Sequence, residues 1–235
     1  MKKIFILITV SFASIASFAQ AVAYSDPAQA YVKLLLDKDA STFSRIDGFK
    51  VIGTCYLFGE KNTGSVFAKE GKAINISLSY NTYNQQVEVY SEGQEKPIYK
   101  DWQTIDSFFL KSTHASSDYK QELQFVNAKL IGSQEKGFMQ IVYTGLKFTL
   151  LKKYKSELGY SSTNYIQSDL RQFDLNYDYF YLNNQTKAVT KLRKNSSSIR
   201  KEFKFIKDID TLVNDDVFTT NQEAALVQLF VVLNN

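Results

Sequence analysis

Apolar and polar residues alternate along much of this chain. Between residues 73 and 81 the apolar side chains from Ile74 to Tyr80 fall at every second position, with polar residues between them. Successive side chains of a strand point to opposite faces, so this pattern predicts a strand with one face on a core and the other in water. Residues 85–92 repeat the pattern around Val87 and Val89.

Ten runs rich in Val, Ile, Tyr and Phe, separated by turn residues, predict ten strands. Gly71, Gly93 and Gly145 stand at three of the breaks. Short breaks between consecutive strands favour antiparallel neighbours. The predicted strands occupy residues 49–58, 63–71, 73–81, 85–92, 97–102, 104–112, 122–132, 137–145, 146–155 and 177–183.

The predicted fold class is therefore mainly β (α+β). We expect an antiparallel β-meander that forms a curved sheet, a sandwich or a partly open barrel, with C-terminal helices packed on it. Strands with only one apolar face do not suit a parallel sheet that is buried on both sides.

The C-terminal part changes to a helical period. Ile199, Phe203 and Ile206 lie on one face of an amphipathic helix over about 199–209. A second helix is expected over 220–233, where Thr220 and Glu223 have the spacing of a capping box. Because its body is apolar almost all round, this helix should pack against the sheet or a partner.

The N-terminus has the features of a secretory signal. Lys2 and Lys3 form a basic start, and an apolar stretch up to Phe18 precedes small residues. The stretch is shorter than the ~20 residues of a membrane helix. We prefer cleavage after Ala19 to cleavage after Ala23, and no cysteine is present there for lipid attachment. Residues 1–19 are thus predicted to be a signal peptide, and the mature protein to be exported, soluble in the periplasm or outside the cell, and not a lipoprotein.

The remainder has the composition of a globular protein, because 44% of residues are hydrophobic and 22% are charged. Only two prolines are present and no Gly/Ser-rich linker divides the chain. We expect an N-terminal segment over 20–48, with a helix start signal at Asp26-Pro27. A single β-rich domain should follow over 49–235. The formal net charge of +4 does not identify a partner.

Thiol catalysis has weak support in the sequence. Cys55 is the only cysteine, and His114, the only histidine, lies in a polar segment with no local signature near either residue. We interpret Cys55 as a packed thiol where an early strand leads into a turn. One histidine and one cysteine also cannot supply the usual ligands of a zinc site.

Asp174, Asn176 and Asp178 have the spacing of calcium ligands. An EF-hand loop needs Gly at its sixth position and Glu at its twelfth, where this chain has Tyr179 and Gln185. Alternate polar positions on a strand edge are the simpler interpretation. We predict no catalytic residue, no metal and no cofactor, although carboxylates of a hydrolase have no fixed spacing and stay open as a third reading.

Basic residues gather between 187 and 207, where Glu202 is the single acidic residue. One interpretation is a solvated face beside the amphipathic helix. The other is a binding site for an anionic envelope component, such as lipid headgroups or acidic glycans, attracted by the local field. An exported protein is not expected to meet nucleic acid. The candidate binding residues are Lys187, Lys191, Arg193, Lys194, Arg200, Lys201, Lys204 and Lys207.

Several short motifs over about 51–233 occur in an order that resembles that of a known protein family. They are Val51-x-Gly53-x-x-Tyr56-Leu57 before Gly64, Leu78-x-Tyr80-Asn81-x-Tyr83, the LLKKY run ending at Tyr154, and YFYL followed by a Lys-rich stretch before FIKD. In this order they resemble an uncharacterised exported family of Bacteroidota with no assigned activity. The chain differs at Cys55, where that family usually has proline. The resemblance implies a compartment and a phylum but no reaction, and it lends no support to a thiol role.

Three functions remain open at this point. The leading hypothesis is a non-enzymatic binding or interaction module of the cell envelope, whose partner is an anionic component or another envelope protein. The alternative is a carrier of lipid or another apolar ligand, which resembles periplasmic lipoprotein carriers. The third is a carboxylate-dependent hydrolase. A cavity lined by Phe and Tyr favours the carrier, a filled core with exposed aromatic residues favours the binding module, and facing carboxylates in a cleft favour the hydrolase.

Overall fold

The computed structural model describes residues 44–46, 49–91, 97–113, 122–160, 170–206 and 209–235. The chain divides into two compact units, residues 1–51 and 52–235. In the first unit β1 (Ser44–Ile46) pairs antiparallel with β2 (Phe49–Ile52), with Ser44 opposite Val51. The predicted signal peptide and nearly all of the predicted N-terminal segment lie outside the described residues.

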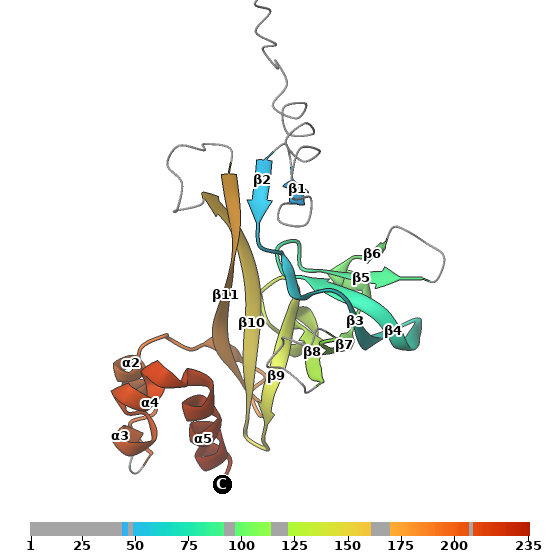
Figure 1. Cartoon of the computed structure of the whole chain (residues 1–235). Coiled ribbons are helices and arrows are strands. Elements are labelled where there is room, and N and C mark those ends of the chain that lie inside the picture. Colours follow the sequence, from blue (N-terminus) through green and yellow to red (C-terminus); the bar gives the residue numbers. More distant parts are fainter. Residues whose placement is uncertain (1–43, 47–48, 92–96, 114–121, 161–169, 207–208) are drawn as a thin grey trace, which may run out of the picture. The chain divides into compact units, whose positions relative to one another are not determined.

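Ten strands of the described part of the second unit form one open sheet (Figure 1). Their order across the sheet is β6, β5, β4, β3, β7, β8, β9, β10, β11 and β12, and all of these neighbours are antiparallel. The strands are β3 (Tyr56–Ala68), β4 (Gly71–Asn81), β5 (Gln86–Tyr90), β6 (Ile98–Lys100), β7 (Ser107–Lys111), β8 (Leu123–Asn127), β9 (Phe138–Thr144), β10 (Phe148–Tyr160), β11 (Leu170–Asn183) and β12 (Val189–Lys191).

The sheet consists of two meanders, which are joined where β3 of the first pairs with β7 of the second. Strands β3 to β6 form the first meander, and β7 then returns from the β6 edge to pair with the other side of β3. Strands β7 to β12 continue from there. The return contains the 3-10 helix Trp102–Thr104, and a second 3-10 helix, Ala128–Ile131, follows β8. The predicted mainly β, antiparallel meander is confirmed, with this return as the feature that alternation alone did not predict.

Most predicted strands correspond to strands of the structure, but the runs 49–58 and 63–71 both contribute to the single strand β3. The end of the run 122–132 forms a 3-10 helix, and β12 was not predicted. The run 49–58 is broken by a turn at Gly53–Cys55, so that β2 ends at Ile52 and β3 begins at Tyr56. Gly53 has a φ of 81°, which glycine adopts without the steric cost of a Cβ. The longest strands, β10 and β11, extend beyond the predicted runs and pair over their full described length from Phe148 to Tyr160.

Four helices follow the sheet in the described chain: α2 (Ser196–Glu202), α3 (Ile209–Leu212), α4 (Asp215–Thr220) and α5 (Gln222–Asn234). The helix predicted over 199–209 begins earlier, at Ser196, because Asn195 accepts a hydrogen bond from the Ser198 amide and caps the helix. It also ends earlier, at Glu202. Asn221 caps α5 through the Ala224 amide at 3.1 Å. The predicted capping box is not formed, since Asn221 takes the position that we assigned to Thr220.

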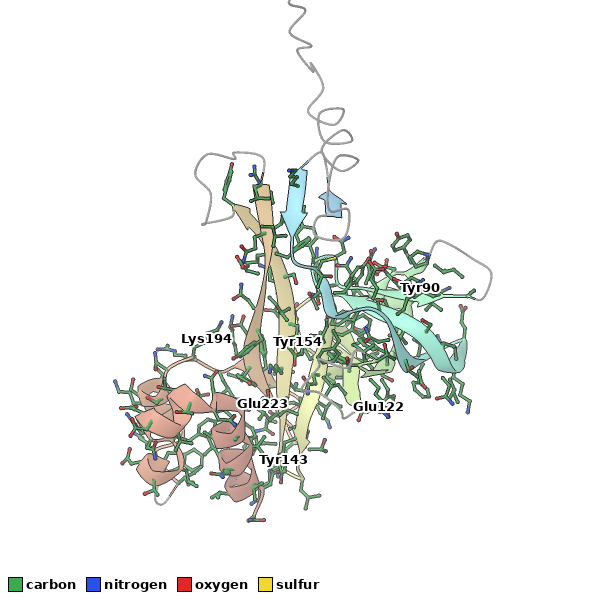
Figure 2. The ribbon with its side chains drawn as sticks, viewed as in Figure 1. Tyr90, Glu122, Tyr143, Tyr154, Lys194 and Glu223 are labelled. Atoms are coloured by element: carbon green, nitrogen blue, oxygen red, sulfur yellow. The ribbon has the colours of Figure 1, made fainter. Side chains whose placement is uncertain are left out.

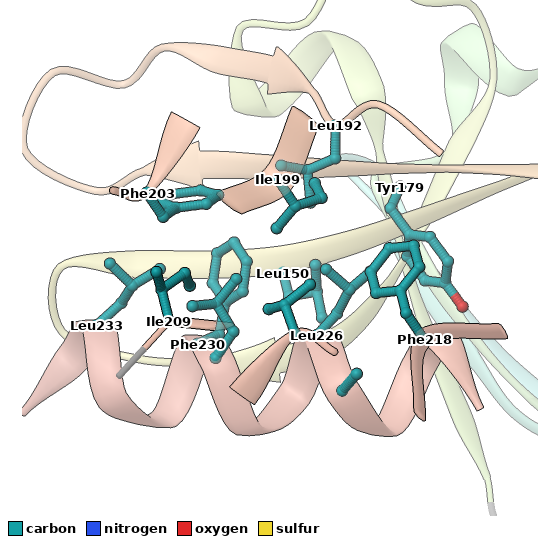
Figure 3. Close-up of a cluster of buried hydrophobic side chains, with 13 residues drawn as sticks. Leu150, Tyr179, Leu192, Ile199, Phe203, Ile209, Phe218, Leu226, Phe230 and Leu233 are labelled. Carbon is teal, nitrogen blue, oxygen red and sulfur yellow. The ribbon is translucent and has the colours of Figure 1, made fainter. Parts of the chain in front are cut away.

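The helices pack on β10 and β11 through one apolar cluster (Figure 3). Leu226, Phe230 and Leu233 of α5 point toward Leu150 of β10, and Phe203 lies above them. Phe230 is fully buried, with its ring centroid 6.1 Å from that of Phe203. Burying an aromatic side chain of this size is worth ~1.5–3 kcal/mol relative to leaving it exposed. The expected packing of the C-terminal helices on the sheet is thus confirmed.

The end of α5 is fixed to the β9–β10 turn by one side chain. The Asn234 carboxamide oxygen accepts hydrogen bonds from the amides of Lys147 and Phe148 at 2.8 and 2.9 Å. Its NH₂ group donates to the Phe148 and Phe230 carbonyl oxygens at 3.1 and 2.7 Å. The helix is consequently held to the sheet by polar contacts as well as by its apolar face.

The sheet has a second apolar cluster around Tyr80, Phe108, Phe125 and Phe138. The Phe108 and Phe125 rings are stacked with centroids 4.6 Å apart, and Phe138 meets Phe108 edge-on at 5.0 Å. All four side chains are fully buried. The aromatic residues of this region therefore fill a core.

Candidate functional site

The candidate basic residues are spread over β12, α2 and the segments beside them. Six of them, Lys187, Lys191, Arg193, Lys194, Lys201 and Lys204, are exposed, Arg200 is half-buried, and Lys207 lies outside the described residues. Some of these side chains are paired with carboxylates inside the fold, and others face a hollow where a ligand can bind.

A basic hollow of about 500 Å³ lies between β12 and α2. Its lining includes three cations, two hydroxyl groups and one carboxylate. Within the described chain, Arg193 and Lys201 form no ion pair, whereas the Glu202 carboxylate accepts a hydrogen bond from the Tyr181 hydroxyl at 3.1 Å. The lining residues are Thr190, Lys191, Arg193, Ser198, Lys201 and Glu202. Cations and hydroxyl donors around one hollow suit an anionic group.

Asp178 of β11 contacts two of the predicted lysines. Its two carboxylate oxygens lie 2.7 Å from Lys191 Nζ and 3.3 Å from Lys194 Nζ. Partial burial favours a raised pKa for Asp178, but the hydrogen bonds and charges of the two lysines outweigh it, and the pKa is lowered. The 174–178 region lies within β11, as the strand interpretation predicted, but residues 174–177 are all exposed and do not show the predicted alternation.

Arg200 has a structural role instead. Its guanidinium donates to the Val213 carbonyl oxygen at 2.9 Å and lies 3.5 and 3.2 Å from the carboxylates of Asp210 and Asp215. These contacts join α2 to α3 and α4. With three partners around it, Arg200 is occupied within the helical part and is removed from the binding candidates.

A second hollow, of about 550 Å³, lies where the start of α5 meets β10 and β11, and we call it the tyrosine hollow. Lys194 and Glu223 both lie in this region (Figure 2). The lining residues that matter for its chemistry are Lys152, Tyr177, Tyr179, Lys194, Gln222 and Glu223.

Lys152 is the least expected residue of the tyrosine hollow, because its side chain is only 5% exposed. The ammonium lies 2.6 Å from Glu223 Oε2 and over the rings of Tyr177, Tyr179 and Tyr154, at 4.3, 5.5 and 5.0 Å from their centroids. The negative faces of the rings and the carboxylate together compensate for the loss of water around the cation.

The two carboxylate oxygens of Glu223 differ in their hydrogen bonds within the described chain. Its Oε2 accepts hydrogen bonds from Lys152 at 2.6 Å and from the Tyr179 hydroxyl at 2.8 Å. Burial, followed by the charge and hydrogen bond of the Glu223 carboxylate, raises the pKa of Tyr179 well above its usual value. The hydroxyl therefore stays a donor at neutral pH, and Oε1, on a side chain 34% exposed, can accept from a ligand.

Cys55 lies in the turn between β2 and β3, as the sequence predicted. Burial, with the charge of Glu88 as the next cause, raises the pKa of the thiol from 9.0 to about 11. A thiol with a raised pKa is protonated at neutral pH and is a poor nucleophile. The histidine that would have to act as its base, His114, lies outside the described residues.

Metal sites and membrane-spanning helices are both absent from the part of the chain that the structure describes. No three His, Cys, Asp or Glu side chains among these residues approach closely enough to hold a metal ion. No helix in the same ranges is long and apolar enough to cross a bilayer. The basic hollow has no aromatic residue in its lining. The tyrosine hollow combines Tyr177, Tyr179 and Phe218 with seven other residues, all polar or charged, so it is not the mainly aromatic cavity expected of a carrier.

No protein-family profile, curated protein or solved structure matches the chain.

Sequence reasoning found the basic hollow but missed the tyrosine hollow. Lys191, Arg193 and Lys201 were predicted as binding residues and are brought together, whereas Lys194 belongs to the second hollow. A signal for Lys152 is present in the alternation, because it shares a strand face with Leu150 and Tyr154 and is the polar exception in that row. The partner Glu223 is distant in sequence and has no comparable signal.

Proposed function

We propose that this chain is a non-enzymatic binding module of the cell envelope that holds an anionic component in its basic hollow. The observation that carries the proposal is the convergence of Lys191, Arg193 and Lys201 with the Thr190 and Ser198 hydroxyls on one hollow. Lys191 is paired with Asp178, but Arg193 and Lys201 against the Glu202 carboxylate still leave the hollow positive. An anion that replaces water there gains charge-assisted hydrogen bonds.

Export to the periplasm or the cell exterior belongs to the same proposal. It is supported by the basic start, apolar stretch and small residues of the first 19 positions. The filled aromatic core supports a binding module over a carrier, because the aromatic side chains pack on each other around Phe108 and Phe125. The resemblance to the exported Bacteroidota family is compatible with this compartment and stays a prediction.

Binding of purified protein to defined anionic surfaces tests the proposal. Vesicles of phosphatidylglycerol and the polysaccharide polygalacturonate serve as anionic probes, with phosphatidylcholine vesicles and dextran as their neutral counterparts. Wild-type protein should bind at least one anionic probe at ~50 mM salt and lose affinity as salt increases, since exposed charges are screened.

The variant pair Arg193→Gln and Lys201→Gln should reduce this binding at least tenfold. Lys69→Gln with Lys72→Gln removes the same charge from exposed positions on the β3–β4 hairpin and should leave affinity within about twofold. Wild-type protein that binds neither anionic probe, or equal losses in the two double variants, would refute a specific anionic site.

A further inference from the structure

Two exposed tyrosines lie on one face of the β10–β11 pair, beyond the part that the helices cover. In the antiparallel register Tyr154 is opposite Tyr177, Ser156 is opposite Leu175, and Tyr160 is opposite Arg171, so these residues share one face. The helices cover the same face only around Leu150 and Tyr179. Beyond them Tyr177 is 40% exposed, Leu175 is 46% exposed and Tyr160 is 74% exposed. Between the two tyrosines, Tyr154, Ser156 and Phe173 of the same face are buried.

The two exposed tyrosines are separated by the length of an extended ligand. Tyr160 lies six positions along β10 from Tyr154, the residue opposite Tyr177. At the rise of a β-strand, ~3.3 Å per residue, this offset corresponds to ~20 Å along the face. A single small molecule does not span this distance, but a chain of several sugar rings does.

We propose that this face, together with the tyrosine hollow, binds an acidic polysaccharide whose sugar rings stack on Tyr177 and Tyr160. The inference rests on the proposed function for the anionic character of the ligand and adds its chemical class. One face of a pyranose ring presents C–H bonds with partial positive charge, and these are attracted to the negative face of an aromatic ring.

Both tyrosine rings are held in place by cations. The Arg171 guanidinium carbon lies 3.8 Å from the Tyr160 ring centroid, so one side of that ring is occupied while most of its surface stays exposed. The Lys152 ammonium lies 4.3 Å from the Tyr177 centroid. Fixed rings lose little conformational entropy on stacking, which favours binding of a ligand with many hydroxyl groups and a small apolar surface.

The polar lining of the hollow matches the other groups of an acidic sugar. Glu223 Oε1 can accept from a sugar hydroxyl, because the hydrogen bonds from Lys152 and Tyr179 go to Oε2. Lys194, whose side chain is 63% exposed, can bind a carboxylate. Asp178 contacts Lys194 of this hollow and Lys191 of the basic hollow, so one chain can reach both.

The ligand class distinguishes this site from a lipid site. An acyl chain needs an apolar enclosure, whereas Tyr160 is open to solvent and Tyr177 lies beside the polar lining of the hollow. A headgroup alone would use the cations but would leave the ~20 Å row of exposed rings without a role.

Affinity electrophoresis of the full chain in gels that contain polygalacturonate tests the inference. Gels with poly-glutamate offer the same charge without sugar rings, and gels with dextran offer sugar rings without charge. Polygalacturonate should retard the wild-type protein at least tenfold more strongly than either of the other polymers. Equal retardation by poly-glutamate would overturn the inference and leave a site for charge alone.

Substitutions of Tyr177 and Tyr160 provide a second test of the inference. Tyr177→Ala and Tyr160→Ala should each weaken polygalacturonate binding about tenfold, whereas Tyr177→Phe should stay within threefold of wild type because it retains the ring. Tyr160 is far more exposed than Tyr177, so its variant keeps the test valid if Tyr177→Ala lowers the thermal midpoint. Unchanged binding of Tyr160→Ala would overturn the inference. If the double variant Arg193→Gln, Lys201→Gln loses polygalacturonate binding in that case, the proposed function holds although this inference fails.

Discussion

Lys152 of β10 and Glu223 of α5 form an ion pair of 2.6 Å at the point where the last helix meets the sheet. The lysine side chain is 5% exposed and the glutamate side chain 34% exposed, so the pair is shielded on one side and open to the tyrosine hollow on the other. The Tyr179 hydroxyl donates to the same carboxylate oxygen at 2.8 Å. This pair links the packing of the helix to the geometry of the hollow.

Removing one partner of the pair should destabilise the protein. Lys152→Met leaves the Glu223 carboxylate with one hydrogen bond, and because that carboxylate is partly solvated we expect a loss of about 1–3 kcal/mol in the free energy of unfolding. The double variant Lys152→Met with Glu223→Leu should recover part of this loss. Lys155→Met, in an exposed pair with Glu157, is the matched control on the same strand and should change stability by less than about 0.5 kcal/mol.

Urea denaturation of wild type, Lys152→Met, Glu223→Leu and the double variant measures the coupling between Lys152 and Glu223. Losses that simply add in the double variant would mean that the two residues act independently, contrary to the contact described here.

The apolar face of α5 should contribute more than any ion pair. Phe230 is fully buried against Tyr181 and Phe203, so Phe230→Ala should lower the free energy of unfolding by about 3–5 kcal/mol. Val231 is 39% exposed on the same helix, and Val231→Ala should stay within about 0.5 kcal/mol of wild type. Comparable effects of the two substitutions in thermal or chemical unfolding would show that the helix is not docked as described.

The pKa of Cys55 predicts slow alkylation. A pKa raised from 9.0 to about 11 lowers the thiolate fraction at pH 8, and iodoacetamide should modify the folded protein at least about tenfold more slowly than the urea-unfolded chain. Modification of the native protein at the rate of a free thiol would contradict the buried setting.

The same shift affects stability at alkaline pH. Between the unfolded pKa near 9.0 and the folded pKa near 11 the unfolded chain releases the thiol proton while the folded chain keeps it, so this contribution to stability is present below pH 9 and is lost as the pH rises toward 11. Cys55→Ser should remove that component of the pH dependence. At neutral pH it should cost at most about 1–2 kcal/mol and leave ligand binding unchanged.

Sequence patterns predicted the strands of this fold well because a half-buried strand has a period of two. The row Ile74 to Tyr80 illustrates the limit of the rule, since Leu78 and Tyr80 are fully buried while Ile74 is 53% exposed near the start of its strand. The prediction that the polar face of this strand meets water was wrong at Ser79, which is fully buried. Alternation reports the two faces of a strand. It does not report how far along the strand the core extends.

The helix boundaries and the tyrosine hollow could not be predicted from alternation, because both depend on side-chain contacts. Asn195 and Asn221 end up as caps because their side chains reach the amides three residues ahead, although Thr220 offered a plausible alternative. Lys152 and Glu223 are 71 residues apart in the chain. The basic hollow was predictable because its cations are close in sequence. The tyrosine hollow was not, because its residues come from β10, β11, α4, α5 and the segment that follows β12.

Processing of the N-terminus has a direct test. The apolar stretch followed by small residues predicts a mature chain that begins at Gln20, or as the second choice at Tyr24, and is recovered without detergent. N-terminal sequencing of protein purified from the native host supplies the answer. An intact Met1 on protein that sediments with membranes would contradict the predicted signal peptide.

The central claim, that the basic hollow binds an anionic group, is tested most directly by amide NMR spectra recorded during a titration with a galacturonate oligosaccharide, and with inorganic phosphate as a second anion. We predict that the amide signals of residues 190–193 and 198–202 shift progressively, and that these shifts disappear in the Arg193→Gln, Lys201→Gln variant. Shifts spread over exposed lysines elsewhere, such as Lys69 and Lys72, or the absence of shifts with both anions, would contradict the account.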